Sequence, residues 1–305
     1  MEDAQVKIFV IIVTYKGKRW YDRCFTSLRN STIPVQTIVV DNASNDGTVE
    51  YIRENYPEIM LIESKENLGF GKGNNLALKY AYEHGCDYVF LLNQDAWLNK
   101  DDTLEKLVEV AKNHPEYGIL SPMHLNVNKT GLSMKEFCRK PCNEKLISDL
   151  YLNNLSDIYG TTYIHAAAWL LPRRTLQTIG GFDPIFPHYG EDDDYLNRVR
   201  FHKLKIGVCP FSRIVHDHQE HPKTDAQLQY IHDLNKLVEY IDINHPFKPG
   251  DCMWHYLKKW LHGILRFDAT QRRSVKNDMR FLRMKAKEIK LHRDRNIQVG
   301  KTWLE

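Results

Sequence analysis

The sequence predicts an α/β protein with a doubly wound, mostly parallel sheet and a helical C-terminal extension. Short apolar runs alternate with helix-like segments over residues 1–125, and such alternation implies parallel strands joined by crossover helices. Several of these runs end in polar residues that include a carboxylate, as ligand sites in open sheets often require. Residues 251–305 instead carry a basic, helix-like pattern after a break at Pro246–Gly250.

The first 125 residues supply four strand–helix pairs. Each predicted strand is a short apolar run, and the last helix shows one apolar face made by Leu104, Leu107, Val108 and Ala111. The strands are expected over Lys7–Val13, Thr37–Val40, Ile59–Glu63 and Tyr88–Leu92. The helices are expected over Trp20–Asn30, Thr48–Asn55, Asn75–His84 and Leu104–Asn113.

The rest of the chain is less regular. Residues 126–160 are polar, so we expect a long loop with a short helix over the ligand site. The elements expected next are an apolar segment at Tyr163–Leu171, a helix near Arg174–Ile179 and a Gly/Pro/aromatic loop at 180–190. The last are a helix from about Asp192, a strand at Ile206–Cys209, a helix over 224–243 and a basic helical tail over 252–295.

Composition places the chain among soluble globular proteins. It has no N-terminal signal-peptide pattern and no apolar stretch near the ~20 residues of a membrane span. Its six scattered cysteines fit reduced thiols, so a cytoplasmic location is expected. Residues 251–305 hold 14 Lys/Arg and 6 Asp/Glu, a net charge of +8, whereas the remainder has −5. A basic tail on a mildly acidic body indicates contact with an anionic surface, either lipid or nucleic acid.

Two predicted strands end near carboxylates that would lie at the ligand crevice. Asp41 follows the run Ile38–Val40, where it could accept a hydrogen bond from a uracil or thymine N–H or from a ribose hydroxyl. An ordinary turn with Asp as a helix cap is the alternative. Asp95 comes shortly after Tyr88–Leu92 and could ligate Mg²⁺ or Mn²⁺ on a diphosphate. A plain turn residue is the alternative there.

Two further segments carry candidate chemistry. Residues 67–75 contain Gly69, Gly71 and Gly73, which allow a close approach of the backbone to a ligand. Their spacing matches neither a dinucleotide motif nor a P-loop, and a flexible loop is the alternative. Four carboxylates, Glu191 to Asp194, stand at a predicted helix start, where the helix dipole favours acids. Four in a row exceed what capping needs, and crowded carboxylates raise one another's pKa, which suits a general base.

Three histidines, His216, His218 and His221, follow the predicted strand at Ile206–Cys209. One imidazole could complete a metal site with Asp95. All three together are not expected to hold zinc, because their spacing does not bring them to one helix face. Surface histidines in a polar loop are the alternative.

Taken in order, these segments resemble the family 2 glycosyltransferases over about residues 6–240. The pieces are Val10–Tyr15, Val40–Thr48, Asn67–Asn75, Leu92–Asp95, Gly181–Asp183, Glu191–Asp194 and Val215–His216. The pattern is most similar to the rhamnosyltransferase and galactofuranosyltransferase-like branch that builds bacterial surface polysaccharides. The resemblance implies the GT-A fold, a Rossmann-like doubly wound sheet. It also implies a nucleotide-sugar-binding half (1–125), an acceptor-binding and catalytic half (126–250) and a separate basic extension (251–305).

The resemblance further implies roles for individual residues. Thr14, Tyr15 and Asp41 would line the base and ribose pocket, and Gly71, Asn74 and Asn93 would contact the nucleotide. Asp95 and His216 would hold Mg²⁺ or Mn²⁺, Asp192 would be the catalytic base, and Glu191 would help position the acceptor. The first acid of the family's DxD motif is Asn93 here, so the metal has one fewer charged ligand.

The activity implied is an inverting, metal-dependent transfer of a sugar from a UDP- or dTDP-linked donor to a glycan or lipid-linked acceptor. One rival is a sugar-phosphate nucleotidyltransferase, which needs a Gly-rich triphosphate loop where Tyr15–Arg19 has a single glycine. The other is a nucleic-acid-binding protein that uses the tail, although we expect no nucleic acid as a partner.

The tail has an apolar stripe at helical spacing with Trp and Lys/Arg at its edges. The stripe consists of Met253, Leu257, Trp260, Leu261 and Ile264. Such a stripe suits peripheral contact of residues 252–295 with the inner face of the cytoplasmic membrane. Packing on the protein's own core, or on another subunit of a homo-oligomer, is the alternative.

Overall fold

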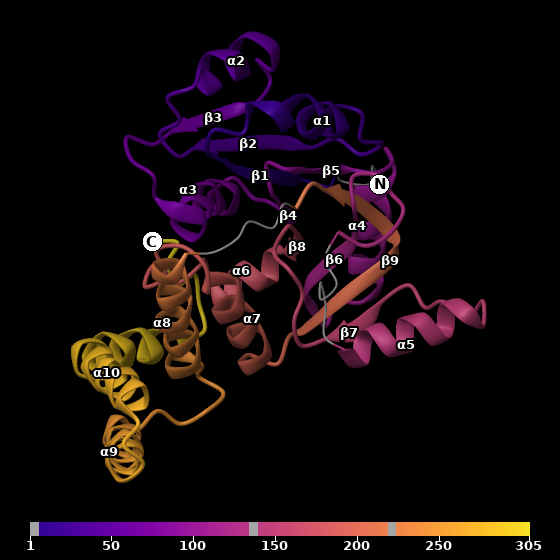
Figure 1. Ribbon diagram of the computed structural model, residues 1–305. Helices are drawn as coiled ribbons and strands as arrows, with labels where there is room; N and C mark the ends of the chain where they lie inside the picture. Colours follow the sequence, from indigo (N-terminus) through magenta and orange to yellow (C-terminus); the bar gives the residue numbers. More distant parts are fainter. Residues whose placement is uncertain (1–5, 134–139, 219–223) are drawn as a thin grey trace.

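The computed structural model describes residues 6–133, 140–218 and 224–305. Its centre is a nine-stranded sheet with the strand order β3-β2-β1-β4-β8-β6-β9-β5, and β7 pairs with β9 (Figure 1). The strands are β1 Ile8–Thr14, β2 Gln36–Asp41, β3 Met60–Glu63, β4 Tyr88–Leu92, β5 Ala96–Leu98, β6 Tyr117–Leu125, β7 Tyr159–Thr161, β8 Ala168–Pro172 and β9 Lys205–His216. The helices are α1 Lys18–Arg29, α2 Thr48–Asn55, α3 Gly69–Glu83, α4 Thr103–Asn113, α5 Lys140–Tyr151, α6 Arg173–Ile179, α7 Glu191–Phe201, α8 Asp225–Ile241, α9 Pro249–Leu265 and α10 Ala269–Asn296.

Four of the eight described strand pairs run parallel, and these four contain most of the paired residues of the sheet. β1 pairs in parallel with β2 and β4, β2 pairs in parallel with β3, and β6 pairs in parallel with β9. β8 is antiparallel to both β4 and β6, and it therefore joins the two parallel sets. The short strands β5 and β7 are antiparallel to β9. The predicted fold class, a mostly parallel α/β sheet with a helical C-terminal region, is confirmed.

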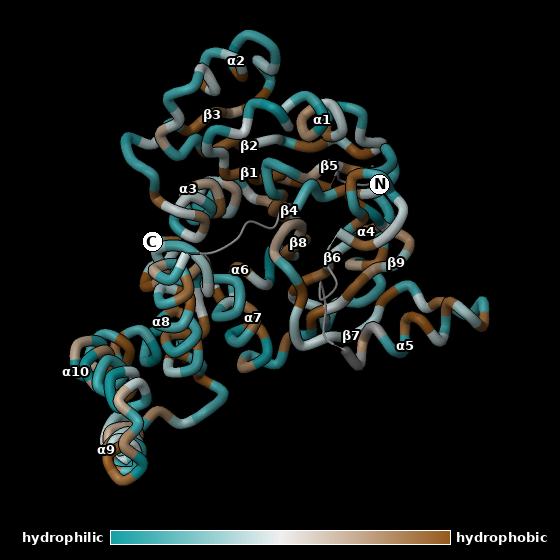
Figure 2. Tube along the Cα trace, in the orientation of Figure 1, coloured by the Kyte–Doolittle hydropathy of each residue, from teal (hydrophilic) through white to brown (hydrophobic). Residues whose placement is uncertain are grey.

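Alternating residues of β1 enter two cores on opposite faces of the sheet. Ile8, Val10 and Ile12 pack with α1, α2 and α4, whereas Phe9 and Ile11 pack with α3, α6 and α7. Strand side chains alternate with a period of two, so a strand covered on both faces must be apolar throughout. Figure 2 shows hydrophobic residues concentrated along the central strands. The result is a three-layer arrangement with helices on both faces of the sheet.

Most predicted elements differ from their expected bounds by a few residues, and the strands β5, β6 and β7 were not expected. Two larger changes affect the site. α3 begins at Gly69, so the predicted glycine loop ahead of Asn75 is the first part of the helix. Gly73 makes this possible, since a Cβ there would lie 3.0 Å from Val13 Cγ1. β9 continues to His216 instead of ending at Cys209, because its pairing with β6 resumes after a register shift. His216 is therefore the last residue of a strand and not part of a polar loop.

The short helix expected within residues 126–160 is present as α5, but it does not cover the ligand site as predicted. α5 packs against β7, away from α3 and α8 (Figure 1). None of its described residues lines the cleft described below. Residues 134–139, from the same predicted segment, lie outside the described residues, and so does His221.

The predicted tail forms two helices, α9 and α10, with a break at residues 266–268. They enclose a third core with α8, and this core reaches Phe186 in the main domain. Asp183 also holds the end of α10, because it accepts hydrogen bonds from His292 Nδ1 (2.5 Å) and Asn296 Nδ2 (2.8 Å). Among the described helices, none has the length and apolar character needed to cross a membrane.

The predicted apolar stripe of α9 is divided between the interior and the surface. Met253 packs into the third core, and Leu257 and Trp260 are half-buried. Leu261 and Ile264 are exposed, and hydrophobic residues are visible on α9 at the bottom of Figure 2. Packing on the protein's own core therefore accounts for only part of the stripe.

Candidate active site

The ends of β1 and β2 are joined by the side chains predicted to line a nucleotide pocket. Thr14 and Asp41 are opposite each other in the strand register, and Thr14 Oγ1 donates a hydrogen bond to Asp41 Oδ1 (3.2 Å). Asp41 Oδ2 accepts the backbone N–H of Ser44 at 2.9 Å. Asp41 therefore closes the turn after β2, and its oxygens keep further lone pairs for a ligand.

Tyr15 is attached to the end of β4 through its backbone. Its N–H donates to Gln94 Oε1 (3.0 Å), and Gln94 Nε2 donates to the Tyr15 carbonyl (3.2 Å). The Tyr15 side chain itself is 43% exposed. This reciprocal pair aligns the ends of β1 and β4, a role for Gln94 that the sequence did not indicate.

Gly71 and Asn74 lie in the first turns of α3. A Cβ at Gly71 would come within 3.1 Å of Phe182 Cβ and 3.5 Å of Glu191 Cβ, so the glycine lets α3 approach the start of α7. Asn74 is buried and donates to the Phe70 carbonyl (2.9 Å). Contact of either residue with a nucleotide stays a prediction.

A cleft of about 350 Å³ lies between the end of β4, the end of β9 and the start of α7. Its lining includes five predicted site residues, Asn93, Asp95, Glu191, Asp192 and His216. The other predicted residues, Thr14, Tyr15, Asp41, Gly71 and Asn74, do not line this cleft.

The first turn of α7 presents two carboxyl groups in different protonation states. Glu191 is 4% exposed, and burial, with the Asp192 charge adding to it, raises the pKa of Glu191 to about 8. Burial, with Asp193 adding to it, raises the pKa of Asp192 to about 6. At neutral pH Glu191 therefore keeps its proton while Asp192 is ionised. Pairs of carboxyls with separated pKa values are typical of acid–base sites.

Asp194, the last acid of the cluster, has a structural contact instead. It forms a buried ion pair with Arg198 Nε at 2.9 Å. Arg198 also donates to the carbonyls of Ile179 (3.0 Å) and Gly181 (2.7 Å). This network holds the start of α7 against the loop that precedes it, so the four acids do not share one role.

Asp95 and His216 meet because β5 pairs with the end of β9. Ala96 is the register partner of His216, and Asp95 Oδ1 lies 3.5 Å from His216 Nε2. His216 is almost fully buried, whereas Asp95 reaches the cleft. A carboxylate oxygen beside an imidazole nitrogen is a donor pair that fits a divalent cation.

Several cleft residues were not predicted. Trp20 Nε1 donates to Asp217 Oδ2 (2.9 Å), and the Arg19 guanidinium stacks 3.9 Å from the centre of the Trp20 ring. The others are His165, Ala166, Phe70, His188, Tyr189 and His218. Burial, with His216 nearby, lowers the pKa of His165 to about 4. Phe70 and His218 fall inside segments that the sequence had singled out, the glycine segment and the histidine segment, whereas Trp20 and His165 belong to no predicted motif.

Comparison with known proteins agrees with the fold. Residues 9–180 match the model of the family described as glycosyl transferase family 2. The structure of S. aureus TarS 1–349 in complex with UDP-GlcNAc aligns with a TM-score of 0.59 at 17% identity, covering 94% of this chain and 90% of that one.

Two curated relatives have similar sequences. The low-salt glycan biosynthesis hexosyltransferase Agl10 of Haloferax volcanii is 24% identical over 218 residues, which cover 68% of this chain and 66% of the relative. The N-acetylglucosaminyl-diphospho-decaprenol L-rhamnosyltransferase of Mycobacterium tuberculosis is 24% identical over 235 residues, covering 70% of this chain and 76% of the relative. Because the family match spans more than half of its length, this chain belongs to glycosyl transferase family 2 and is a glycosyltransferase.

Proposed function

We propose that this glycosyltransferase moves a sugar from a UDP- or dTDP-linked donor to a hydroxyl group of a glycan or lipid-linked acceptor, with inversion at the anomeric carbon. The observation that carries the proposal is the cleft in which Asp192 shares one space with Asp95 and His216. A base for the acceptor and a cation for the leaving diphosphate are the two requirements of such a displacement. Relatives named for glycan biosynthesis and for a diphospho-decaprenol-linked sugar support the acceptor class.

The reaction is a single in-line displacement. Asp192 accepts the proton of the acceptor hydroxyl while the acceptor oxygen forms a bond to the anomeric carbon. The bond from that carbon to the diphosphate oxygen breaks in the same step, and its electron pair leaves with the diphosphate. Glu191, which keeps its proton up to about pH 8, donates a hydrogen bond that positions the acceptor. One displacement inverts the configuration, so no covalent intermediate is needed.

We assign a divalent cation, Mg²⁺ or Mn²⁺, to Asp95 and His216, whose donor atoms lie 3.5 Å apart beside the cleft. When bound, such a cation neutralises the negative charge that grows on the leaving diphosphate. Asn93 lines the same cleft and offers a neutral amide oxygen in place of a second carboxylate. Thr14, Tyr15 and Asp41 would hold the base and ribose at the adjoining strand ends.

The turn between α9 and α10 offers a surface for an anionic membrane. Leu265 and Phe267 are 78% and 90% exposed there, and Leu261 lies one turn earlier. The basic residues Lys258, Lys259 and Arg266 are exposed on the same segment. Each Lys or Arg near an anionic leaflet contributes about 1 kcal/mol, and apolar side chains between them add interfacial burial. We therefore place the enzyme at the inner face of the cytoplasmic membrane, where a lipid-linked acceptor would be reached.

The donor class is tested with a panel of UDP-, dTDP- and GDP-sugars in the presence of Mn²⁺. The correct donor should raise the melting temperature and release its sugar slowly to water. Failure of every donor to do either would contradict the proposal, and steep salt-dependent binding of oligonucleotides would favour the nucleic-acid alternative.

The base is tested with Asp192→Asn, which is isosteric and cannot accept the proton. We expect the donor-induced rise in melting temperature to persist and kcat to fall by ~10²–10⁴. Asp251→Asn, in the first turn of α9 and exposed, is the matched control and should leave kcat unchanged. Transfer by Asp192→Asn within about threefold of wild type would remove Asp192 from this role.

A further inference from the structure

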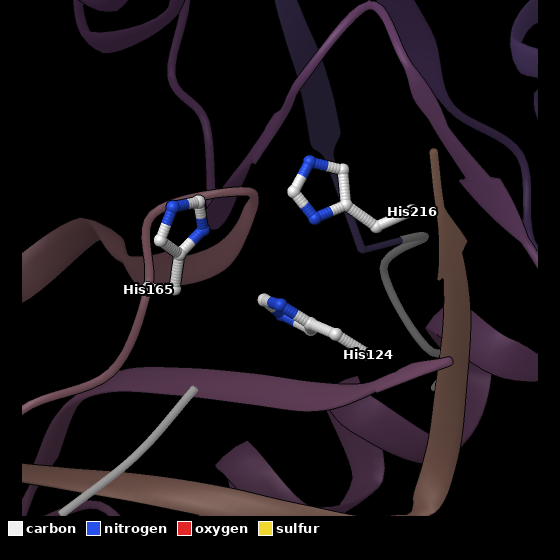
Figure 3. A group of neighbouring side chains, drawn as sticks. All are labelled: His124, His165 and His216. Carbon is white, nitrogen blue, oxygen red and sulfur yellow. The ribbon is translucent and has the colours of Figure 1, made fainter. Parts of the chain in front are cut away.

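Three histidines from distant parts of the chain converge beside the cleft (Figure 3). His124 lies near the end of β6, His165 lies in the loop before β8, and His216 ends β9. One ring nitrogen of each histidine lies within 4.8 Å of the others. Figure 3 shows the three rings arranged around a common space.

The sheet brings two of these rings together. In the parallel pairing of β6 with β9, His124 is opposite Ile214, and His216 comes two residues later on the same strand. Strand side chains alternate between faces, so His216 points to the same side of the sheet as Ile214 and His124. His165 approaches from the loop and is partly exposed.

Ser121 fixes the orientation of the His124 ring. The Ser121 hydroxyl lies 2.7 Å from the Ala168 carbonyl, 3.2 Å from the Pro122 carbonyl and 3.1 Å from His124 Nε2. Its single proton goes to a carbonyl, which can only accept, so Ser121 Oγ accepts the Nε2–H of His124. The lone pair of the ring is then on Nδ1. Metal-ligating histidines typically donate their other N–H in this manner.

In each of the other two rings, one nitrogen lies inside the protein. Nδ1 of His165 and Nδ1 of His216 are buried and have no hydrogen-bond partner among the described residues. Buried polar groups are normally paired, so two such nitrogens side by side point to a ligand that accepts lone pairs. A metal cation is such a ligand.

We propose that His124, His165 and His216 form a three-imidazole site for a divalent transition metal. The proposal deepens, and rests on, the assignment of a cation to this end of the cleft, and it places that cation on the Nδ1 side of His216. Asp95 Oδ1 lies 3.5 Å from Nε2, the other nitrogen of the same ring, so Asp95 would orient the His216 ring. Imidazole nitrogens suit Zn²⁺ and the other late first-row metals, Co²⁺ included, whereas Mg²⁺ prefers oxygen ligands and keeps several waters. The site should therefore select transition metals over Mg²⁺.

Direct metal binding tests the proposal without any measurement of transfer. Metal-free protein is titrated with Co²⁺, whose visible absorption reports its ligands, and the bound Co²⁺ is then challenged with Mg²⁺ and Zn²⁺. We expect one Co²⁺ per chain, displaced by Zn²⁺ and retained in excess Mg²⁺. His165→Gln should weaken Co²⁺ affinity by at least about tenfold, and Ser121→Ala by about tenfold through loss of ring orientation. His188→Gln, a cleft histidine outside the triad, is the matched control and should leave Co²⁺ affinity unchanged.

Equal Co²⁺ affinity of wild type and His165→Gln would overturn the proposal, and so would displacement of Co²⁺ by equimolar Mg²⁺. His165 is partly exposed, so its substitution should be compatible with folding, which circular dichroism checks. The donor-induced melting shift, measured without metal, reports separately on the proposed function. A donor shift without Co²⁺ binding refutes the metal site alone, whereas Co²⁺ binding that depends on His165 supports the site even if no donor binds.

Discussion

Glu191→Gln should stabilise the protein, and the gain should grow as the pH rises. Glu191 is 4% exposed at the start of α7, and its pKa is raised from 4.5 to about 8 by burial and by the neighbouring Asp192 and Asp193 charges. The native state therefore keeps a proton that the unfolded chain has lost. Stability from this group is fully present below pH 4.5 and is lost as the pH rises through about 8.

The magnitude follows from the two pKa values. They are about 3.5 apart, and each pH unit between them costs about 1.4 kcal/mol, so the full loss is about 4–5 kcal/mol above pH 8. Gln has the same shape and no charge, so it escapes this loss. Between pH 5 and pH 8.5 the advantage of Glu191→Gln over wild type should grow by about 4 kcal/mol. For a protein of this size that corresponds to a relative rise in melting temperature on the order of 8 °C.

The assay is thermal or urea unfolding of both proteins at pH 5 and pH 8.5, with EDTA present so that no cation contributes. Glu50→Gln provides a matched control, because Glu50 is an exposed acid in the first turn of α2. Its effect should be the same at both pH values. Parallel pH dependence of wild type and Glu191→Gln would refute the argument, since it would mean that Glu191 is not held protonated in the native protein.

Three further outcomes are expected. Transfer should fall as the pH drops through about 6, because Asp192 gains its proton there. Asp193→Asn should move this fall to lower pH, because the Asp193 charge raises the pKa of Asp192. An unchanged pH–rate profile in Asp193→Asn would contradict this reasoning. EDTA should abolish transfer, and full activity in EDTA would refute the cation role. Asp95→Ala should raise the cation concentration needed for half-maximal activity, whereas the control Asp101→Ala, at an exposed position, should not. Anionic liposomes should sediment the protein at low salt more than at high salt, and Phe267→Ser should reduce this whereas Leu291→Ser, also exposed, should not. A dimer that dissociates on Phe267→Ser, without binding to liposomes, would instead favour a subunit interface.

Local sequence patterns were sufficient for the regular part of the fold. The bounds of α2 and β4 are those predicted, because Thr48–Asn55 and Tyr88–Leu92 are each set by a local period and a clear stop. The glycine segment was predicted as a loop because glycine disfavours helix locally. It is helical because Gly71 and Gly73 allow α3 to pack closely against Phe182 and Val13.

In the cleft, some residues could be predicted from local sequence, whereas others depend on contacts between distant segments. The positions of Asp95 and Asp192 could be predicted, since each is a polar residue just beyond an apolar strand or at a helix start. The end of β9 could not, because pairing with β6 resumes past a register shift and carries the strand on to His216. The separation of Glu191 from Asp192 in pKa also depends on burial by segments far away in the chain.

The sequence by itself determined the fold class, the alternation of β1 to β4 with α1 to α4, and the residue types available for base and cation chemistry, but it did not indicate β5, β6 or β7. These follow from periodicity and short motifs, which depend on neighbours within a few residues. Only the tertiary structure decided which of those residues share one cleft, that Asp194 pairs with Arg198, and that His124 and His165 lie beside His216. The physical reason is that these contacts arise from sheet register and burial, and both depend on segments separated by tens of residues in the sequence.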